Sequence, residues 1–102
     1  MDIKMNTDGG KMNVALTGRL DTTTSPQFEA QVLAKLEGVK ELILDITELL
    51  YISSAGLRVL LACQKKMNVS GGKMVVINPN EMIMDVFEMT GFNDILTIEN
   101  NQ

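Results

Sequence analysis

The sequence has no histidine and no tryptophan, and it holds a single cysteine, Cys63. Without histidine, the chain lacks the side chain that most often acts as a general base near neutral pH, and the usual zinc ligand sets are excluded. One cysteine excludes a disulfide within the chain. Because Cys63 lies in an apolar run, we interpret it as a small core residue and not as a nucleophile.

Aromatic residues and long apolar runs are also scarce. With one tyrosine and three phenylalanines, the core must consist of aliphatic side chains and methionines, of which there are eight. No apolar run approaches the ~20 residues that a membrane-spanning helix needs, and no signal-peptide pattern opens the chain. We therefore expect a cytoplasmic protein with no membrane partner.

Clustered positive charge is missing as well. Nine basic residues stand against thirteen acidic ones, which gives a net charge of -4. The basic residues are scattered, and only Lys65 and Lys66 are adjacent. Because nucleic acids and anionic membranes bind clustered cations, we expect neither as a direct partner. The 102 residues, of which 45% are hydrophobic, suffice for one compact domain spanning residues 1–102.

The first forty residues predict a hairpin and then a helix. Residues 1–18 alternate between apolar and polar on either side of the turn residues Thr-Asp-Gly-Gly, and Gly18 is expected to end the second strand. Ser25 is expected to cap a helix whose first position suits Pro26, and Gly38 is expected to end it. The apolar face of this helix recurs every four residues: Phe28, Val32 and Leu36.

The remaining residues predict strands separated by single helices. Residues 40–47 contain a nearly continuous apolar run, typical of a central strand covered on both faces or nearly so. A helix is expected over 54–69, a strand over 73–79, a helix over 81–91 after the cap Asn80, and a last strand over 94–99. This order predicts an α/β domain with a mixed, mostly parallel sheet of four to five strands.

Two adjacent serines, Ser53 and Ser54, stand where the second helix is expected to begin. Spacing alone favours a helix cap. A second interpretation is a phosphorylation site, because a helix N-terminus tolerates the roughly -1.5 to -2 charges of a phosphate. The small residues Ala55 and Gly56 are expected to let another protein approach the serines closely.

The faces of this helix suggest where a partner binds. Five residues share the face assigned to the sheet: Gly56, Val59, Leu60, Cys63 and Met67. Arg58 and Lys65 lie on the opposite side, with Leu57 and Leu61 on the flank between. That flank suits an acidic protein partner, unless neighbouring helices bury the two leucines. For the methionines of residues 81–91 (Met82, Met84 and Met89), we expect mostly core positions.

No pattern in the chain indicates an enzyme or a cofactor. The pairs Gly9-Gly10 and Gly71-Gly72 match neither a dinucleotide fingerprint nor a phosphate loop. The serines have no histidine to activate them. Four carboxylates lie at expected element ends, where caps and surface charges are the ordinary interpretation: Asp21, Asp45, Glu48 and Asp94.

Three stretches cover most of the chain: "VALTGRLDTTTSPQFEAQV", "ELILDITELLYISSAGLRVLLACQKKM" and "GGKMVVINPNEMIMDVFEMTGFNDILTI". Together they resemble the STAS domain family in its bacterial anti-sigma factor antagonist form. The first is similar to the family's second strand and Gly-x-Leu-Asp turn, the second to its central strand, phosphoacceptor loop and second helix, and the third to its closing segment. The resemblance covers essentially the whole chain and implies helices packed mainly on one face of the sheet.

The resemblance implies a switch protein and not a catalyst. An anti-sigma factor of the serine kinase type binds the unphosphorylated antagonist and thereby releases a sigma factor. The kinase then phosphorylates one serine, and a separate serine phosphatase resets the switch. The family motif Asp-Ser-Ser/Thr-Gly-Leu places the acceptor at Ser54, with Ser53 at the position where many members have Asp, which leaves Ser53 as the alternative acceptor.

The resemblance also implies a partner-binding surface, and it leaves other functions open. Asp21 matches the acidic residue of the Gly-x-Leu-Asp turn and, with Thr22, is expected either to contact the partner or to brace the threonine loop. The whole expected surface comprises Asp21, Thr22, Ser53, Ser54, Ala55, Gly56, Leu57, Arg58 and Leu61. Alternative functions are a STAS subunit of a transporter or of a stressosome-like assembly, and a small-molecule or nucleotide-binding domain.

Overall fold

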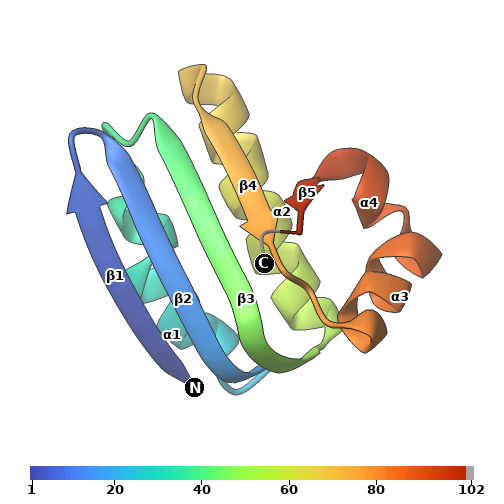
Figure 1. The fold of residues 1–102 in the computed structure, drawn as a ribbon. Helices are drawn as coiled ribbons and strands as arrows, with labels where there is room; N and C mark the ends of the chain where they lie inside the picture. Colours follow the sequence, from blue (N-terminus) through green and yellow to red (C-terminus); the bar gives the residue numbers. More distant parts are fainter. Residues whose placement is uncertain (101–102) are drawn as a thin grey trace.

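The computed structural model describes residues 1–100. Its elements follow in the order β1 (Asp2–Asp8), β2 (Lys11–Leu20), α1 (Ser25–Gln31), the short 3-10 helix η1 (Leu33–Lys35), β3 (Glu41–Ile52), α2 (Ser54–Ser70), β4 (Lys73–Ile77), α3 (Glu81–Thr90), α4 (Phe92–Ile95) and β5 (Thr97–Glu99). Figure 1 shows them along the chain. The described residues include no helix that is long and apolar enough to cross a membrane.

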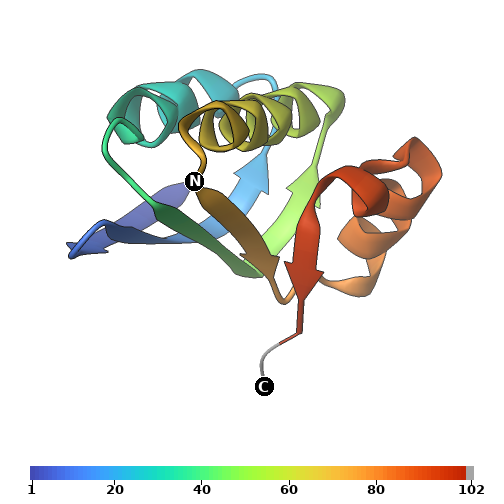
Figure 2. The same ribbon diagram turned by 90° about the horizontal axis from the view of Figure 1, so that it is seen from above.

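The strands form one mixed sheet in the order β1-β2-β3-β4-β5. β1 pairs with β2 as an antiparallel hairpin, and the other neighbours are parallel. Helices α1 and α2 lie side by side on one face of the sheet, while α3 and α4 lie beside its β4–β5 side (Figure 2). The predicted α/β class, mixed sheet and mainly one-sided helix packing are therefore confirmed.

The core lies between the sheet and the helices α1 and α2. Alternate strand residues point into it, because side chains of a strand alternate between faces: Met12, Val14 and Leu16 of β2 and Leu42, Leu44 and Ile46 of β3 are buried. Phe28, Leu60 and Met67 meet them from the helices. Cys63 is fully buried, and this burial raises the pKa of its thiol to about 12, as befits the predicted core residue.

The central strand differs from the prediction in length and in coverage. β3 continues to Ile52 and so includes the residues expected to form a connection. Its second face is not covered by helices, and Ile43 and Asp45 on that face are only half-buried. The apolar run was misleading because Ile43 adds an apolar side chain to the open face.

The start of the first helix also differs from the prediction. Ser25 is the first helical residue and not the cap; its Oγ donates a hydrogen bond to the Asp21 carbonyl at 2.6 Å. The α-helix ends at Gln31, and η1 completes the turn toward the expected end at Gly38. Gly18 does not end β2, which shifts register there, at a φ of +105°, and runs on to Leu20.

In the C-terminal third, the predicted ends of the helix α3 are confirmed, but the methionines of this helix are more exposed than predicted. Asn80 Oδ1 accepts a hydrogen bond from the Ile83 N–H at 2.8 Å, and Gly91 ends α3 in the left-handed conformation. The short helix α4 was not predicted, and it delays the last strand to Thr97. Met82 and Met89 are exposed by 58% and 86%, so the expectation that most of these methionines are core residues is wrong.

Candidate functional site

The candidate site forms where β2 and β3 end and α2 begins. The Ser53 N–H donates a hydrogen bond to the Leu20 carbonyl at 3.0 Å, so the start of α2 is tied to the end of β2. Asp21 and Thr22 directly follow that carbonyl in the chain. The structure thus brings the Gly-x-Leu-Asp turn and the two serines to the same edge of the sheet, although Asp21 and Ser53 are 32 positions apart in the sequence.

The two serines have different environments. Ser53 is the N-cap: its backbone is extended, and its Oγ accepts a hydrogen bond from the Gly56 N–H at 3.4 Å. This confirms the predicted cap. Ser54 is the first residue of α2, its side chain is exposed, and its Oγ has no hydrogen-bond partner among residues 1–100. The free hydroxyl of the pair therefore belongs to Ser54.

Asp21 braces the loop that precedes α1. Its Oδ1 accepts hydrogen bonds from the backbone N–H groups of Thr23 and Thr24 at 3.0 and 3.1 Å, and from Thr24 Oγ1 at 3.2 Å. The backbone hydrogen bond from Thr24 is the main reason why the pKa of the Asp21 carboxyl lies below its ordinary value. Thr22 is exposed beside it.

A basic and an aromatic residue near the serines were missed from the sequence. Arg19 and Tyr51 are register partners at the end of the β2–β3 pair, and the Arg19 guanidinium lies 4.4 Å from the centre of the Tyr51 ring. Arg19 Nε also lies 3.7 Å from Asp21 Oδ2. The sequence did hold one signal for Arg19, because this residue is the variable position of the Gly-x-Leu-Asp turn. The register shifts that bring Tyr51 opposite it leave no pattern in the sequence.

Three of the expected contact residues are buried. Ala55 and Leu57 are each 7% exposed, and Gly56 is also buried, so they do not form an open surface for a partner. The close approach that Gly56 permits is internal: a Cβ on it would lie 2.7 Å from the Leu20 carbonyl oxygen. Arg58, one turn beyond Ser54, is exposed, and Leu61, about two turns beyond it, is half-buried, so these two present accessible atoms on α2.

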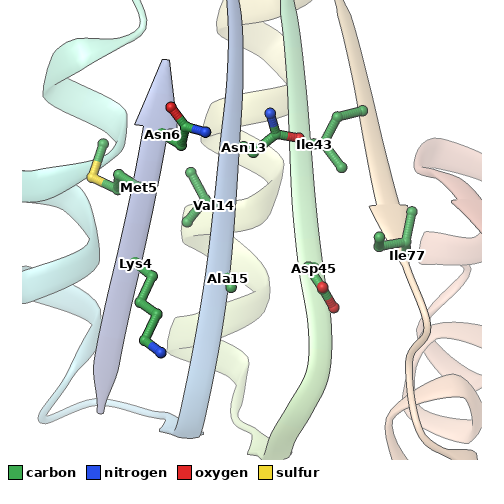
Figure 3. Close-up of a pocket in the computed structure, with 9 residues that line it drawn as sticks. All are labelled: Lys4, Met5, Asn6, Asn13, Val14, Ala15, Ile43, Asp45 and Ile77. Atoms are coloured by element: carbon green, nitrogen blue, oxygen red, sulfur yellow. The ribbon is translucent and has the colours of Figure 1, made fainter. Parts of the chain in front are cut away.

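A separate hollow of about 250 Å³ lies on the open face of the sheet (Figure 3). Its lining includes the apolar side chains of Ala15, Ile43 and Ile77 and the charged side chains of Lys4 and Asp45. In register, Lys4 of β1, Ala15 of β2 and Asp45 of β3 follow one another across the sheet. None of the residues expected at the partner surface lines this hollow.

Comparison with known sequences identifies relatives along the whole chain. The family model described as "STAS domain" matches residues 2–102. BtrV of Bordetella bronchiseptica, whose name assigns it provisionally to the anti-sigma factor antagonists, is 32% identical over 103 residues, covering 100% of this chain and 89% of BtrV. The anti-sigma-B factor antagonist of Bacillus subtilis is 26% identical over 98 residues, covering 96% and 88% of the two chains.

Solved structures share the fold. The crystal structure of TM1081 from Thermotoga maritima superimposes with a TM-score of 0.90 at 20% identity, covering 97% of this chain and 86% of that one. SpoIIAA from Bacillus, in its phosphorylated form, gives a TM-score of 0.80 at 17% identity, with 99% and 92% covered. The family match over residues 2–102, together with the relative at 32% identity, settles the membership that the motifs suggested. The chain belongs to the STAS domain family.

Proposed function

We propose that this protein is an anti-sigma factor antagonist whose binding to a serine kinase-type anti-sigma factor is switched off when Ser54 is phosphorylated. The observation that carries the proposal is the difference between the serines: the Ser53 hydroxyl caps α2, while the Ser54 hydroxyl is exposed and unpaired among the described residues. Relatives named as anti-sigma factor antagonists support it.

The proposed reaction is a phosphoryl transfer from ATP to Ser54 Oγ. The new Oγ–P bond forms as the bond between the β- and γ-phosphates breaks, ADP leaves, and the hydroxyl proton passes to a base of the kinase. This chain supplies the nucleophile and no catalytic group, so it is a substrate and not an enzyme. A separate serine phosphatase hydrolyses the phosphoserine: water attacks the phosphorus, the Oγ–P bond breaks, and inorganic phosphate and the free Ser54 hydroxyl are released.

The helix start explains why the phosphate changes binding without unfolding α2. Free N–H groups and the helix dipole favour negative charge at this end. Arg58 lies one helical turn beyond Ser54, at a spacing that puts the two side chains on the same face. We expect the phosphate to pair with Arg58 and to block the partner by charge and bulk. SpoIIAA has been solved in unphosphorylated and phosphorylated forms, and both share this fold.

The nine residues expected at the partner surface divide into two groups in this proposal. Thr22, Ser54, Arg58 and Leu61 have accessible atoms and contact the anti-sigma factor. The others hold the site in shape: Asp21, Ser53, Ala55, Gly56 and Leu57. The kinase requires ATP, and we accordingly place the protein in the cytoplasm.

Phosphorylation by the cognate kinase tests the proposal. The purified protein is mixed with the kinase and ATP, and the phosphate is located by mass spectrometry. We expect one phosphate on Ser54, none on Ser54→Ala, and normal phosphorylation of Ser53→Ala. Calorimetry should show that Ser54→Ala binds the kinase like the wild type and that the phosphorylated protein does not. Phosphate on Ser53 alone, or tight binding of the phosphorylated protein, would overturn the proposal.

A further inference from the structure

The exposed face of α3 has an unusual combination of apolar and acidic side chains. Met82 and Met89 are 58% and 86% exposed, and Val86, which lies between them at helical spacing, is half-buried. Glu81, Asp85 and Glu88 are exposed on the same helix. Exposed methionines form adaptable contact surfaces, so this face has the composition of a docking surface. We name these six residues the α3 strip.

The charge of the α3 strip is not balanced by the protein itself. Lys73 is the last basic residue of the sequence, so every charged side chain of α3, α4 and β5 is acidic. The one ion pair found within residues 1–100 joins Arg19 and Asp21. The three carboxylates of the α3 strip therefore have no cationic partner among the described residues.

The start of α3 lies close to the serines in the fold. Asn80, the N-cap of α3, donates from Nδ2 to the Leu49 carbonyl of β3 at 3.1 Å. The next residue, Leu50, is 65% exposed, and β3 ends two residues later, just before Ser53. Both ribbon views show α3 beside the half of α2 that begins at Ser54 (Figures 1 and 2).

The exposed charges of α2, the helix that begins at Ser54, have the opposite sign. Arg58 and Lys65 are exposed on α2, which holds no acidic residue, whereas Arg19 at the end of β2 is already paired with Asp21. The region from α2 to α3 is thus bipolar, with a basic half at α2 and an acidic, apolar half at the α3 strip. Complementary charge patterns of this kind fix the orientation of a partner and speed its association.

We infer that the α3 strip is a second docking surface for the anti-sigma factor, and that it takes a basic, apolar segment of that partner while an acidic segment faces α2. This inference rests on the proposed function and adds to it the chemistry of the partner. Because the α3 strip holds no part of the serine pair, it contributes affinity that phosphorylation of Ser54 does not remove directly.

Charge reversal on α3, with a single reversal far from it as control, tests the inference. In Asp85→Lys/Glu88→Lys, two carboxylates beyond the first turn of α3 become cations, and Glu81 is kept because it favours the helix start. Glu37→Lys reverses an exposed charge just before β3 begins, at the end of the sheet away from the serines. Binding of the cognate kinase to unphosphorylated protein is measured by calorimetry between low and moderate salt.

We expect Asp85→Lys/Glu88→Lys to raise the Kd at least tenfold at low salt, with a smaller difference at higher salt, and Glu37→Lys to bind like the wild type. Met82→Gln/Met89→Gln should weaken binding at every salt concentration, whereas Val69→Gln, at an equally exposed apolar residue near the far end of α2, should not. Circular dichroism and unfolding curves check that each variant is folded.

The outcomes separate this inference from the proposed function. Unchanged binding of both α3 variants, with wild-type binding and phosphorylation of Ser54 intact, overturns the inference alone. Wild-type protein that neither binds the kinase nor accepts phosphate overturns the proposed function and this inference with it. If Glu37→Lys reduces the binding free energy by about half as much as Asp85→Lys/Glu88→Lys, as its half as large charge change would predict, the effect is one of net charge, and this also overturns the inference.

Discussion

Gly56 lies so close to Leu20 that a Cβ atom on it would stand 2.7 Å from the Leu20 carbonyl oxygen. The same carbonyl accepts the Ser53 N–H at 3.0 Å. A third constraint comes from Ile52, whose Cγ1 would also lie 2.7 Å from that Cβ. The end of β2 and the first turn of α2 are therefore held together, and this contact determines where Ser54 stands.

Gly56→Ala tests this contact. Alanine favours a helix interior over glycine by about 1 kcal/mol, so propensity alone predicts a stabilised protein. The new methyl group meets a backbone oxygen that cannot rotate away, and overpacking of this kind costs about 1–3 kcal/mol. Because the contact is with backbone, we expect the cost to exceed the gain and the free energy of unfolding to fall by up to about 2 kcal/mol in urea denaturation. A variant as stable as the wild type would show that α2 shifts freely relative to β2.

The case of Gly56 shows what the sequence could and could not predict about the site. The motif located the serines, and the cap at Ser53 followed from the order of apolar and polar residues. The burial of Ala55 and Gly56 did not follow, because it depends on how β2 passes the start of α2. Small residues were interpreted as space for a partner, whereas Gly56 gives space to the chain's own backbone.

The two serines should differ in their contribution to stability. Ser53→Ala removes the cap; such losses cost about 0.5–2 kcal/mol, and the long 3.4 Å bond favours the lower end of that range. Ser54→Ala removes an exposed hydroxyl, which should change stability by less than about 0.5 kcal/mol. Thermal unfolding of both variants measures the difference. Equal losses in the two variants would mean that Ser54 also has a structural role.

Asp21 should make stability depend on pH in the acidic range. Its pKa in the folded protein is lowered, chiefly by the Thr24 N–H, so its contribution to stability is fully present above the unfolded pKa of about 3.9. The contribution is lost as the pH falls through the lower folded pKa. Asp21→Asn keeps the oxygen acceptor and removes the charge. We expect it to be less stable than the wild type at pH 6 and to approach it below pH 4.

This pH prediction has a direct spectroscopic control. The carboxyl carbon of Asp21 can be followed by NMR while the folded protein is titrated with acid. Its midpoint should fall below that of an aspartate in an unstructured peptide. A midpoint at or above the peptide value would show that the Thr23 and Thr24 hydrogen bonds do not favour the ionised carboxylate.

In the C-terminal third, the spacing of apolar residues predicted the helix α3 but not which of its side chains are buried. The cap Asn80 and the terminator Gly91 were predicted, because capping depends on local residue types. The exposure of Met82 and Met89 was not, because an apolar residue in an amphipathic helix is core only if a neighbouring element covers it. The sheet ends at β5, and Ile83 and Phe87 already fill the face of α3 that turns inward.

Gln64 should be replaceable by a hydrocarbon with a gain in stability. It is 7% exposed, and its Nε2 donates to Asn68 Oδ1 at 3.0 Å, while its Oε1 has no partner among residues 1–100. An unpaired buried oxygen costs more than the loss of one part-buried hydrogen bond, and Met has a similar shape. We expect Gln64→Met to raise the free energy of unfolding by about 1 kcal/mol, and the exposed Gln31→Met to change it by less than about 0.5 kcal/mol. A loss in Gln64→Met would indicate that a water or another group pairs with Oε1.

The hollow on the open face of the sheet should be independent of the switch. Ala15 lines it, and because strand side chains alternate between faces, Ala15 points away from the core side on which its neighbours Val14 and Leu16 are buried. Ala15→Leu extends into the hollow without entering the core, so it should change stability by less than about 0.5 kcal/mol. Phosphorylation of Ser54 and binding of the kinase should match the wild type in mass spectrometry and calorimetry. If filling the hollow weakened either of them in a folded variant, a ligand or partner on this face would be coupled to the serine site.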